Sequence, residues 1–282
     1  MTPTAGTRAG VRRYPVAATL GEAPMWCTQT RRLWFVDIRG PALYRLDPLS
    51  GTMERTAFGE LLGMVVLGRD GLVIGHGRQV LRYDPATGAT DLVAELPAPH
   101  PAVRINDTKV GPDGSLWCGT MRDGGGAPDG SLYRIRPDGT VATVLSGISV
   151  PNALAFSPDG AHVYFTDTRE GTILRGDARA EDPAFAPFAA PDIAPGHPDG
   201  ATVDAEGCLW VTRHGAGAIA RIDPDGRLDR LVELPATQPT SCAFGGDDLR
   251  TLFVTTARQR MSPEALAAEP AAGDVLALAV GV

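Results

Sequence analysis

The feature that most constrains the fold of this chain is an internal repeat. A short apolar stretch, a turn rich in Asp and Gly, and a second apolar or aromatic stretch recur along the sequence. The copies are Met25–Phe35, Val66–Val73, Thr108–Trp117, Ala155–Tyr164, Thr202–Trp210 and Ala243–Leu252. A repeat of this kind indicates a modular architecture, in which each unit buries its apolar face against its neighbours.

Each copy is followed by a segment in which apolar and polar residues alternate, as in Ala42–Pro48 and Ser131–Pro137. Such alternation is typical of a half-buried strand. Dividing 282 residues by six gives 47 residues per unit, the length of a four-stranded propeller blade. The sequence therefore predicts an all-β, six-bladed β-propeller. A β-sandwich is the alternative, and six regular copies favour the propeller over it.

The ends of the chain complete this prediction. Residues 1–10 are expected to form a disordered N-terminal lead, and residues 11–282 a single six-bladed propeller domain. Within that domain, Val11–Thr19 is expected to supply an outer strand to the last blade and so to close the ring. Helical periodicity is confined to Pro263–Ala268.

Composition narrows the function classes. The 34 Gly and 24 Pro suit a fold with many tight turns, and the net charge of −7 argues against a nucleic-acid partner. No stretch reaches the about 18 consecutive apolar residues of a membrane span, and the first ten residues lack the apolar core of a signal peptide. The four cysteines form no Cys-x-x-Cys pair and are expected to be buried free thiols. We expect a cytoplasmic monomer without membrane or nucleic-acid partners.

One register of the repeat carries unusual polar residues. Counting back eight positions from the turn of each copy reaches a site expected to lie just before the first strand of the blade, at one end of the central channel. The six residues there are Glu22, Gly63, Asn106, Asn152, Asp199 and Thr240. Two carboxylates and two amides at equivalent positions of a closed repeat favour a divalent metal site with oxygen ligands. Taken singly, each Asn or Asp could instead be an ordinary turn former.

Five segments around these positions resemble the SMP-30/regucalcin/gluconolactonase family, and the likeness extends from about Val16 to Val282. They are Leu20–Trp26, Arg104–Val110, Val150–Leu154, Pro198–Asp204 and Thr240–Gly246. The resemblance implies a six-bladed propeller and the opening of sugar lactones to aldonic acids. It also implies that Glu22, Asn152 and Asp199 are metal ligands, that Asn106 lies at the metal or its bound water, and that Arg104 contacts substrate.

The chain departs from the family at one place. Some relatives carry an acidic substrate contact after a Gly-Thr-Met segment, whereas here Gly119–Gly124 puts Gly at that site with Asp123 adjacent. Asp123 is therefore the candidate third substrate contact, beside Arg104 and Asn106. The loops Met121–Asp129 and Pro97–Val103 are expected to determine which sugar is accepted.

These residues support a mechanism in which the metal polarises the lactone carbonyl and Asp199 acts as general base toward the attacking water. Ca²⁺ suits the oxygen donors best, and Zn²⁺, Mn²⁺, Mg²⁺ or Fe²⁺ remain alternatives. His197 is either a proton shuttle or an ordinary histidine at the rim. Two other functions stay open: an organophosphate or aryl-ester hydrolase using the same metal, and a non-enzymatic calcium-binding regulator.

Overall fold

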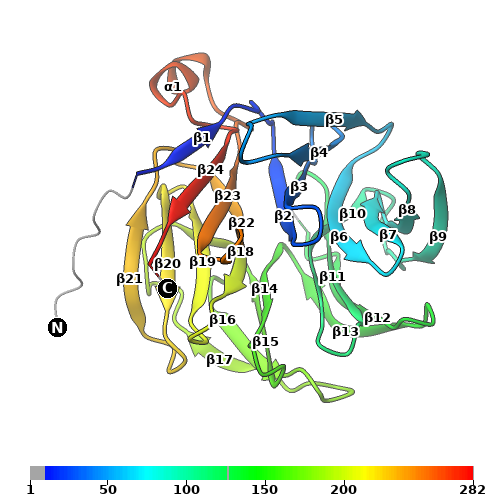
Figure 1. Cartoon of the computed structure of the whole chain (residues 1–282). Helices are drawn as coiled ribbons and strands as arrows, with labels where there is room; N and C mark the ends of the chain where they lie inside the picture. The colour runs from blue at the N-terminus through cyan, green and yellow to red at the C-terminus, as the bar shows by residue number, and fades with distance from the viewer. Residues whose placement is uncertain (1–9, 126, 282) are drawn as a thin grey trace.

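Six four-stranded antiparallel sheets make up the computed structural model, which describes residues 10–125 and 127–281. The sheets follow one another around a ring, and the colours of Figure 1 run around it in chain order. Blade 1 consists of β2 (Gly21–Cys27), β3 (Arg32–Asp37), β4 (Ala42–Leu46) and β5 (Met53–Ala57). Blade 2 consists of β6 (Leu62–Gly68), β7 (Gly71–His76), β8 (Gln79–Tyr83) and β9 (Thr90–Glu95).

The remaining blades repeat this order. Blade 3 consists of β10 (Val103–Val110), β11 (Leu116–Arg122), β12 (Gly130–Ile135) and β13 (Val141–Ile148). Blade 4 consists of β14 (Pro151–Phe156), β15 (His162–Asp167), β16 (Ile173–Asp177) and β17 (Ala186–Ala189). Blade 5 consists of β18 (His197–Val203), β19 (Leu209–His214), β20 (Ala218–Ile222) and β21 (Leu228–Glu233). Blade 6 consists of β22 (Pro239–Gly245), β23 (Thr251–Thr256), β24 (Val275–Ala279) and β1 (Arg12–Tyr14).

The two ends of the chain share blade 6, which closes the ring. β1 pairs with β24 as the outermost strand of that sheet, and Figure 1 shows the blue N-terminal strand beside the red C-terminal one. Asp274 fastens the junction, because its buried carboxylate accepts from the backbone N–H of Val16 at 3.1 Å and from the Arg13 guanidinium at 2.7 Å. The predicted six-bladed propeller, with an outer strand drawn from residues 11–19, is confirmed.

The innermost strands line the axis. β2, β6, β10, β14, β18 and β22 contact one another in sequence, and β22 contacts β2 again, so they form a closed circle. The second strand of each blade runs antiparallel to the first, which places its last residue next to the first residue of the inner strand. We call this end of the ring the entry face. It is built from the loops that lead into the inner strands and from the turns between second and third strands.

The apolar core is divided into wedges between the blades. The described residues contain six buried clusters, and each draws its side chains from two neighbouring blades, apart from Ala257 of blade 6, which joins the cluster between blades 1 and 2. Burial decreases outward: the second strand β11 is buried along all its length except Arg122, whereas the outermost strand β5 is mostly exposed. All four cysteines are buried free thiols, as predicted. Packing between blades therefore stabilises the ring and fixes the inner strands rigidly around the axis.

Other predictions concern the ends and the helix. α1 (Pro263–Ala268) is the helix expected from the sequence, and it begins at Ser262, whose hydroxyl accepts from Ala265 N–H. The helices within 10–125 and 127–281 include none that could cross a membrane. The division into a disordered lead over residues 1–10 and a domain over 11–282 stays a prediction, because residues 1–9 lie outside the described part of the chain.

Candidate functional site

A β-bulge interrupts every inner strand at the same level. Pairing with the second strand shifts between Glu22 and Met25 in blade 1, between Asn152 and Ala155 in blade 4, and between Pro198 and Ala201 in blade 5, with equivalent shifts in the other three blades. An extra residue at a bulge bends the strand and redirects its side chains. The six residues of the predicted ring therefore lie within the inner strands at these bulges, and the expectation that they precede the strands was wrong.

The bulges of blades 1 and 4 require unusual backbone. Ala23 and Ala153, which directly follow Glu22 and Asn152, have φ values of 49° and 51°. Residues with a Cβ rarely adopt this left-handed conformation, and it persists where the surroundings enforce it, often at functional sites. In blade 4 the buried carboxylate of Asp107 contributes, since it accepts from the backbone N–H of Leu154 at 2.8 Å. The orientation of the ring residues is thus imposed by the framework.

Two of the six ring positions offer no free oxygen donor. A Cβ at Gly63 would lie 2.3 Å from the carbonyl oxygen of Ile105, so no side chain fits there. The hydroxyl of Thr240 donates to the carbonyl of Gly21 and lies 2.9 Å from that of Thr255. The ring is therefore reduced to Glu22, Asn106, Asn152 and Asp199.

The two amides are oriented by a continuous chain of hydrogen bonds. Arg104 Nη1 donates to Asn106 Oδ1 at 2.8 Å, and Asn106 Nδ2 donates to Asn152 Oδ1 at 3.2 Å. On the other side of Asn152, Nδ2 donates to Thr168 Oγ1 at 2.8 Å, while the Thr168 hydroxyl donates to the carbonyl of Pro198 at 2.8 Å.

Thr168 fixes which way the Asn152 amide faces. A hydroxyl has one proton, and Thr168 gives it to the Pro198 carbonyl, so this oxygen can only accept from the Asn152 amide nitrogen. The Asn152 nitrogen is therefore directed at Thr168, and its oxygen is directed away from Thr168, at Asn106. That oxygen keeps a second lone pair for a ligand.

The two carboxylates of the ring repel each other. Burial raises the pKa of Glu22 to about 8, the negative charge of Asp107 adds to the rise, and Arg104 opposes it. Burial also raises the pKa of Asp199 well above its usual value, with further contributions from the charges of Glu22 and Asp107, again against Arg104. Side chains from blades 1 and 5 thus lie near enough to disfavour each other's charged form, which is the environment that a bound cation relieves.

A pocket of about 250 Å³ opens from this group onto the entry face. Asn152, Asp199 and Arg104 line it, together with residues from the turns of blades 1, 3, 4, 5 and 6. A larger cavity of about 560 Å³ lies between blades 2 and 3 at the opposite end of the ring, around Arg69 and Asp113. The larger cavity contains none of the axial ring residues, and we therefore place the candidate site in the smaller pocket.

Asp123 lies behind the pocket wall between two arginines. Its carboxylate accepts from Arg104 Nε at 2.9 Å and from Arg39 Nη1 at 2.9 Å. Both of its oxygens are used in this way, so Asp123 orients the guanidinium groups. The predicted direct contact of Asp123 with substrate is less consistent with this arrangement than an indirect role through Arg104.

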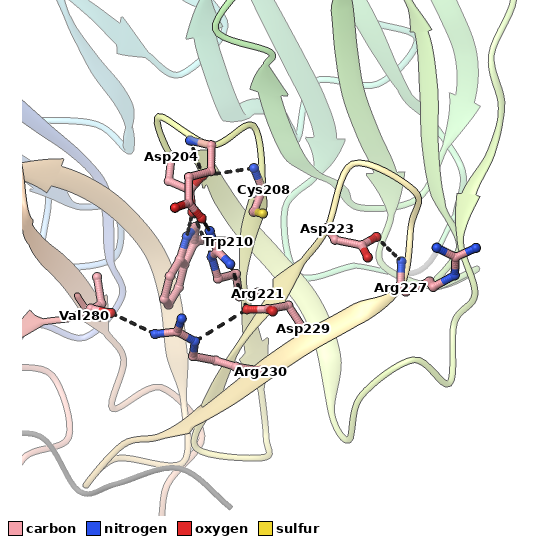
Figure 2. Close-up of polar contacts among 10 residues, drawn as sticks. Asp204, Cys208, Trp210, Arg221, Asp223, Arg227, Asp229, Arg230 and Val280 are labelled. Atoms are coloured by element: carbon pink, nitrogen blue, oxygen red, sulfur yellow. Dashed lines mark hydrogen bonds and ion pairs between the residues drawn. The ribbon is translucent and has the colours of Figure 1, made fainter. Parts of the chain in front are cut away.

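A second acidic cluster lies away from the axis, where Asp204, Glu206 and Cys208 approach one another in the turn between β18 and β19. Figure 2 shows that the guanidinium of Arg221 occupies the space beside Asp204. Arg221 donates to Asp204 at 2.8 Å and to Asp229 at 2.8 Å, and it also pairs with Glu206. Trp210 Nε1 donates to Asp204 at 2.7 Å. With its charge already balanced by arginine, this cluster ties strands of blade 5 together.

Comparison with known proteins agrees with this fold. The sequence model of the SMP-30/gluconolactonase/LRE-like region matches residues 20–258. The chain belongs to this family. Among its relatives, a 6-deoxy-6-sulfogluconolactonase of Pseudomonas putida is 33% identical over 94% of this chain and 92% of its own length. A pentonolactonase of Haloferax volcanii is 34% identical over 87% of this chain and 84% of its own length.

A solved structure supports the same family and fold. The calcium-binding protein regucalcin of Agrobacterium tumefaciens superimposes with a TM-score of 0.91 at 33% identity, covering 96% of this chain and 93% of that protein. The family membership inferred from five sequence segments is therefore confirmed.

Some residues of the pocket were not anticipated from the sequence. Thr168, Arg39, Arg169 and Arg260 belong to turns on the entry face, outside the register from which the ring was derived. The sequence does hold a signal for Arg39 and Arg169. An Asp-x-Arg triplet begins at the last residue of the second strand in blades 1 and 4, at Asp37–Arg39 and Asp167–Arg169. Thr168 has no such signal, since its role depends on the carbonyl of Pro198 in the next blade.

The raised pKa of Glu22, caused first by burial and then by the charge of Asp107, predicts a pH-dependent effect of Glu22→Gln on stability. A carboxyl group with a raised folded-state pKa contributes stability that is complete below its unfolded value of about 4.5 and is lost as pH rises toward about 8. In chelator, the variant is therefore expected to be more stable than the original at pH 8.5 by about 3–5 kcal/mol, the equivalent of about three pKa units. At pH 5 the two proteins should have nearly equal free energies of unfolding.

Urea denaturation at the two pH values measures this difference. Glu233→Gln is the matched control, because Glu233 is exposed on β21 and its replacement should change little at either pH. A Glu22→Gln variant that is destabilised equally at both pH values would contradict the raised pKa of Glu22.

Proposed function

We propose that this protein is a sugar lactonase that depends on one divalent metal ion, with Ca²⁺ the best-suited ion. The observation that carries the proposal is a pocket lined by Asp199, the oriented Asn152 amide and an arginine, with Glu22 near enough to Asp199 for its charge to raise the Asp199 pKa. Relatives over nearly the full length of the chain are named as lactonases of different sugars, which supports the reaction and leaves the sugar open.

The donor set fits a hard divalent cation. Glu22, Asn152 and Asp199 would hold it through oxygen atoms, as Ca²⁺ prefers, and two carboxylates would balance its charge. Asn106 is less suited as a ligand, because its Oδ1 already accepts from Arg104 and its Nδ2 donates to Pro151 and Asn152. Asn106 instead links Arg104 to Asn152 by hydrogen bonds and so orients the Asn152 amide. The likeness to a calcium-binding regucalcin supports the same assignment.

When bound, a divalent cation supplies Lewis-acid polarisation of the lactone carbonyl. Asp199 faces the pocket and takes a proton from the attacking water as the water oxygen bonds to the carbonyl carbon. The ester bond to the ring oxygen then breaks, and Asp199 returns the proton to that oxygen, which leaves an open-chain aldonic acid. Arg104, held by Asp123, donates hydrogen bonds to the oxygen that gains negative charge.

Two other functions share this site. A calcium-binding regulator needs only the ligands, and the regucalcin likeness keeps it as the second candidate. A hydrolase of organophosphates or aryl esters would use the same metal and base. Hydrolysis assays on aldonolactones, paraoxon and an aryl ester, each with Ca²⁺ or with EDTA, separate the three, and the proposal expects EDTA-sensitive hydrolysis of lactones.

Replacing Asp199 with Asn tests the general base. Loss of a positioned base is expected to lower kcat at saturating Ca²⁺ by at least about a hundredfold, measured in a pH-stat with an aldonolactone. Asp225→Asn is the control, because Asp225 forms an exposed pair with Arg227 far from the pocket. Near-normal turnover by the Asp199→Asn protein with metal bound would refute the base assignment, and hydrolysis that EDTA does not affect would remove the metal from the mechanism.

Replacing Thr168 tests the orientation of the Asn152 amide. Thr168→Val removes the acceptor that holds Asn152 Nδ2, so the amide is free to turn and Ca²⁺ affinity should fall about tenfold, as for other residues that orient a ligand. Thr168→Ser keeps the hydroxyl and should keep the affinity. Calorimetric titration of Ca²⁺ into chelator-treated protein measures both, and equal affinities for the Val and Ser variants would contradict the proposed positioning.

A further inference from the structure

The pocket on the entry face is rich in positive charge, although the chain as a whole carries a net charge of −7. Arg39, Arg104, Arg169 and Arg260 all line it, and Asp199 is the one acidic residue among its described lining residues. Two of the arginines, Arg39 and Arg104, are compensated by Asp123 at 2.8 Å and 2.9 Å. One carboxylate shared by two guanidinium groups leaves an excess of one positive charge.

The other two arginines, Arg169 and Arg260, differ from this pair. Within residues 10–125 and 127–281, no carboxylate lies at ion-pair distance from Arg169 or Arg260. The one hydrogen bond of the Arg260 guanidinium within the described part of the chain is long, at 3.5 Å to the carbonyl of Gly124. A side chain added at Gly125 would meet the guanidinium of Arg169 at 3.5 Å. The two uncompensated groups therefore approach the same short segment, Gly124–Gly125, at the pocket mouth.

Backbone hydrogen bonds fix the positions of Arg169 and of Arg39, its counterpart in blade 1. Arg169 N–H donates to Asp167 Oδ1 at 3.1 Å, and in blade 1 Arg39 N–H donates to Asp37 Oδ1 at 3.1 Å. Blades 1 and 4 are opposite each other in a ring of six, so the same turn presents an arginine to the pocket from two sides. In blade 1 the arginine pairs with Asp123, whereas in blade 4 no carboxylate of the described residues pairs with it.

The positive field acts on neighbouring groups. Burial lowers the pKa of His214, and the charges of His197 and Arg260 lower it further. Such a field attracts anions to the outer part of the pocket, where Arg169 and Arg260 lie. It is not needed for a neutral sugar, and a divalent ion bound by two carboxylates would leave the excess of positive charge unchanged.

We propose that the lactone bound here carries a negative group of its own, remote from the ring carbonyl, which Arg169 and Arg260 bind. This inference rests on the proposed lactonase function and specifies its substrate class. Sulfonate, phosphate and carboxylate share the required chemistry, because each presents several oxygens to the planar donors of a guanidinium. Arg104 remains directed at the reacting end of the molecule.

A set of matched substrates tests the inference. Gluconolactone is compared with derivatives in which the terminal hydroxyl is replaced by phosphate or sulfonate or oxidised to carboxylate, at saturating Ca²⁺. For at least one of the charged lactones, kcat/KM is expected to exceed that of gluconolactone at least about tenfold, the effect of one charge-assisted hydrogen bond. The charged group that gives the largest ratio identifies the substrate class, and this ratio should fall with rising salt.

Variants locate the effect. Arg169→Gln and Arg260→Gln should each lower the ratio of charged to neutral kcat/KM about tenfold. Arg250→Gln removes the same charge from an exposed position between β22 and β23, at the opposite end of the ring, and should leave the ratio unchanged. Calorimetric binding of the open-chain products should show the same dependence on Arg169 and Arg260 without relying on turnover.

The results of these experiments distinguish the anionic-substrate inference from the proposed lactonase function. Hydrolysis of gluconolactone with no preference for any charged derivative, or a ratio that both arginine variants leave unchanged, overturns the inference and leaves the lactonase in place. Absence of hydrolysis for the neutral and all charged lactones overturns the proposed function and this inference with it.

Discussion

The constraint on which the site depends is the enforced proximity of two like charges. Glu22 and Asp199 come from blades 1 and 5, and the charge of Glu22 disfavours ionisation of Asp199, which lines the pocket. A flexible chain would separate them. Here they cannot separate, because the inner strands form a closed circle and β1 locks the last blade to the C-terminal strand. The ring therefore maintains an unfavourable arrangement that a divalent cation would relieve.

The energy that supports this arrangement is distributed around the ring. Each pair of neighbouring blades shares one apolar cluster among the described residues, so displacement of one inner strand disturbs packing on both of its sides. The bulges then turn the side chains toward the axis at a level that all six blades share, and the left-handed backbone of Ala23 and Ala153 is held by that framework. The apolar clusters between the blades stabilise the fold, whereas the polar residues of the candidate site lie on the axis and on the entry face.

Much of the fold could be predicted because the signal is periodic. Six copies of a strand–turn–strand pattern identify the blades, and equivalent positions in a closed repeat converge, which led to Glu22, Asn106, Asn152 and Asp199 without coordinates. Periodicity does not specify local distortion, however. The bulges place these residues inside the inner strands, and contacts across blade boundaries remove Gly63 and Thr240 as donors, which no single repeat reveals.

Residues that act through another blade were the hardest to predict. Thr168 orients Asn152 through a carbonyl of blade 5, and Asp123 links arginines of blades 1 and 3. The free arginines were also missed, because a single Arg in a turn is an ordinary surface residue until the turns are assembled. Their significance comes from the shared Gly124–Gly125 segment and from the absence of acidic partners among the described residues.

The most direct test of the central claim is anomalous X-ray diffraction from crystals soaked in Mn²⁺, which substitutes for Ca²⁺ at oxygen-rich sites. The account predicts one strong anomalous peak on the axis, about 2.0–2.6 Å from oxygens of Glu22, Asn152 and Asp199. Absence of a peak there, or a peak only beside Asp204 and Glu206, would contradict it.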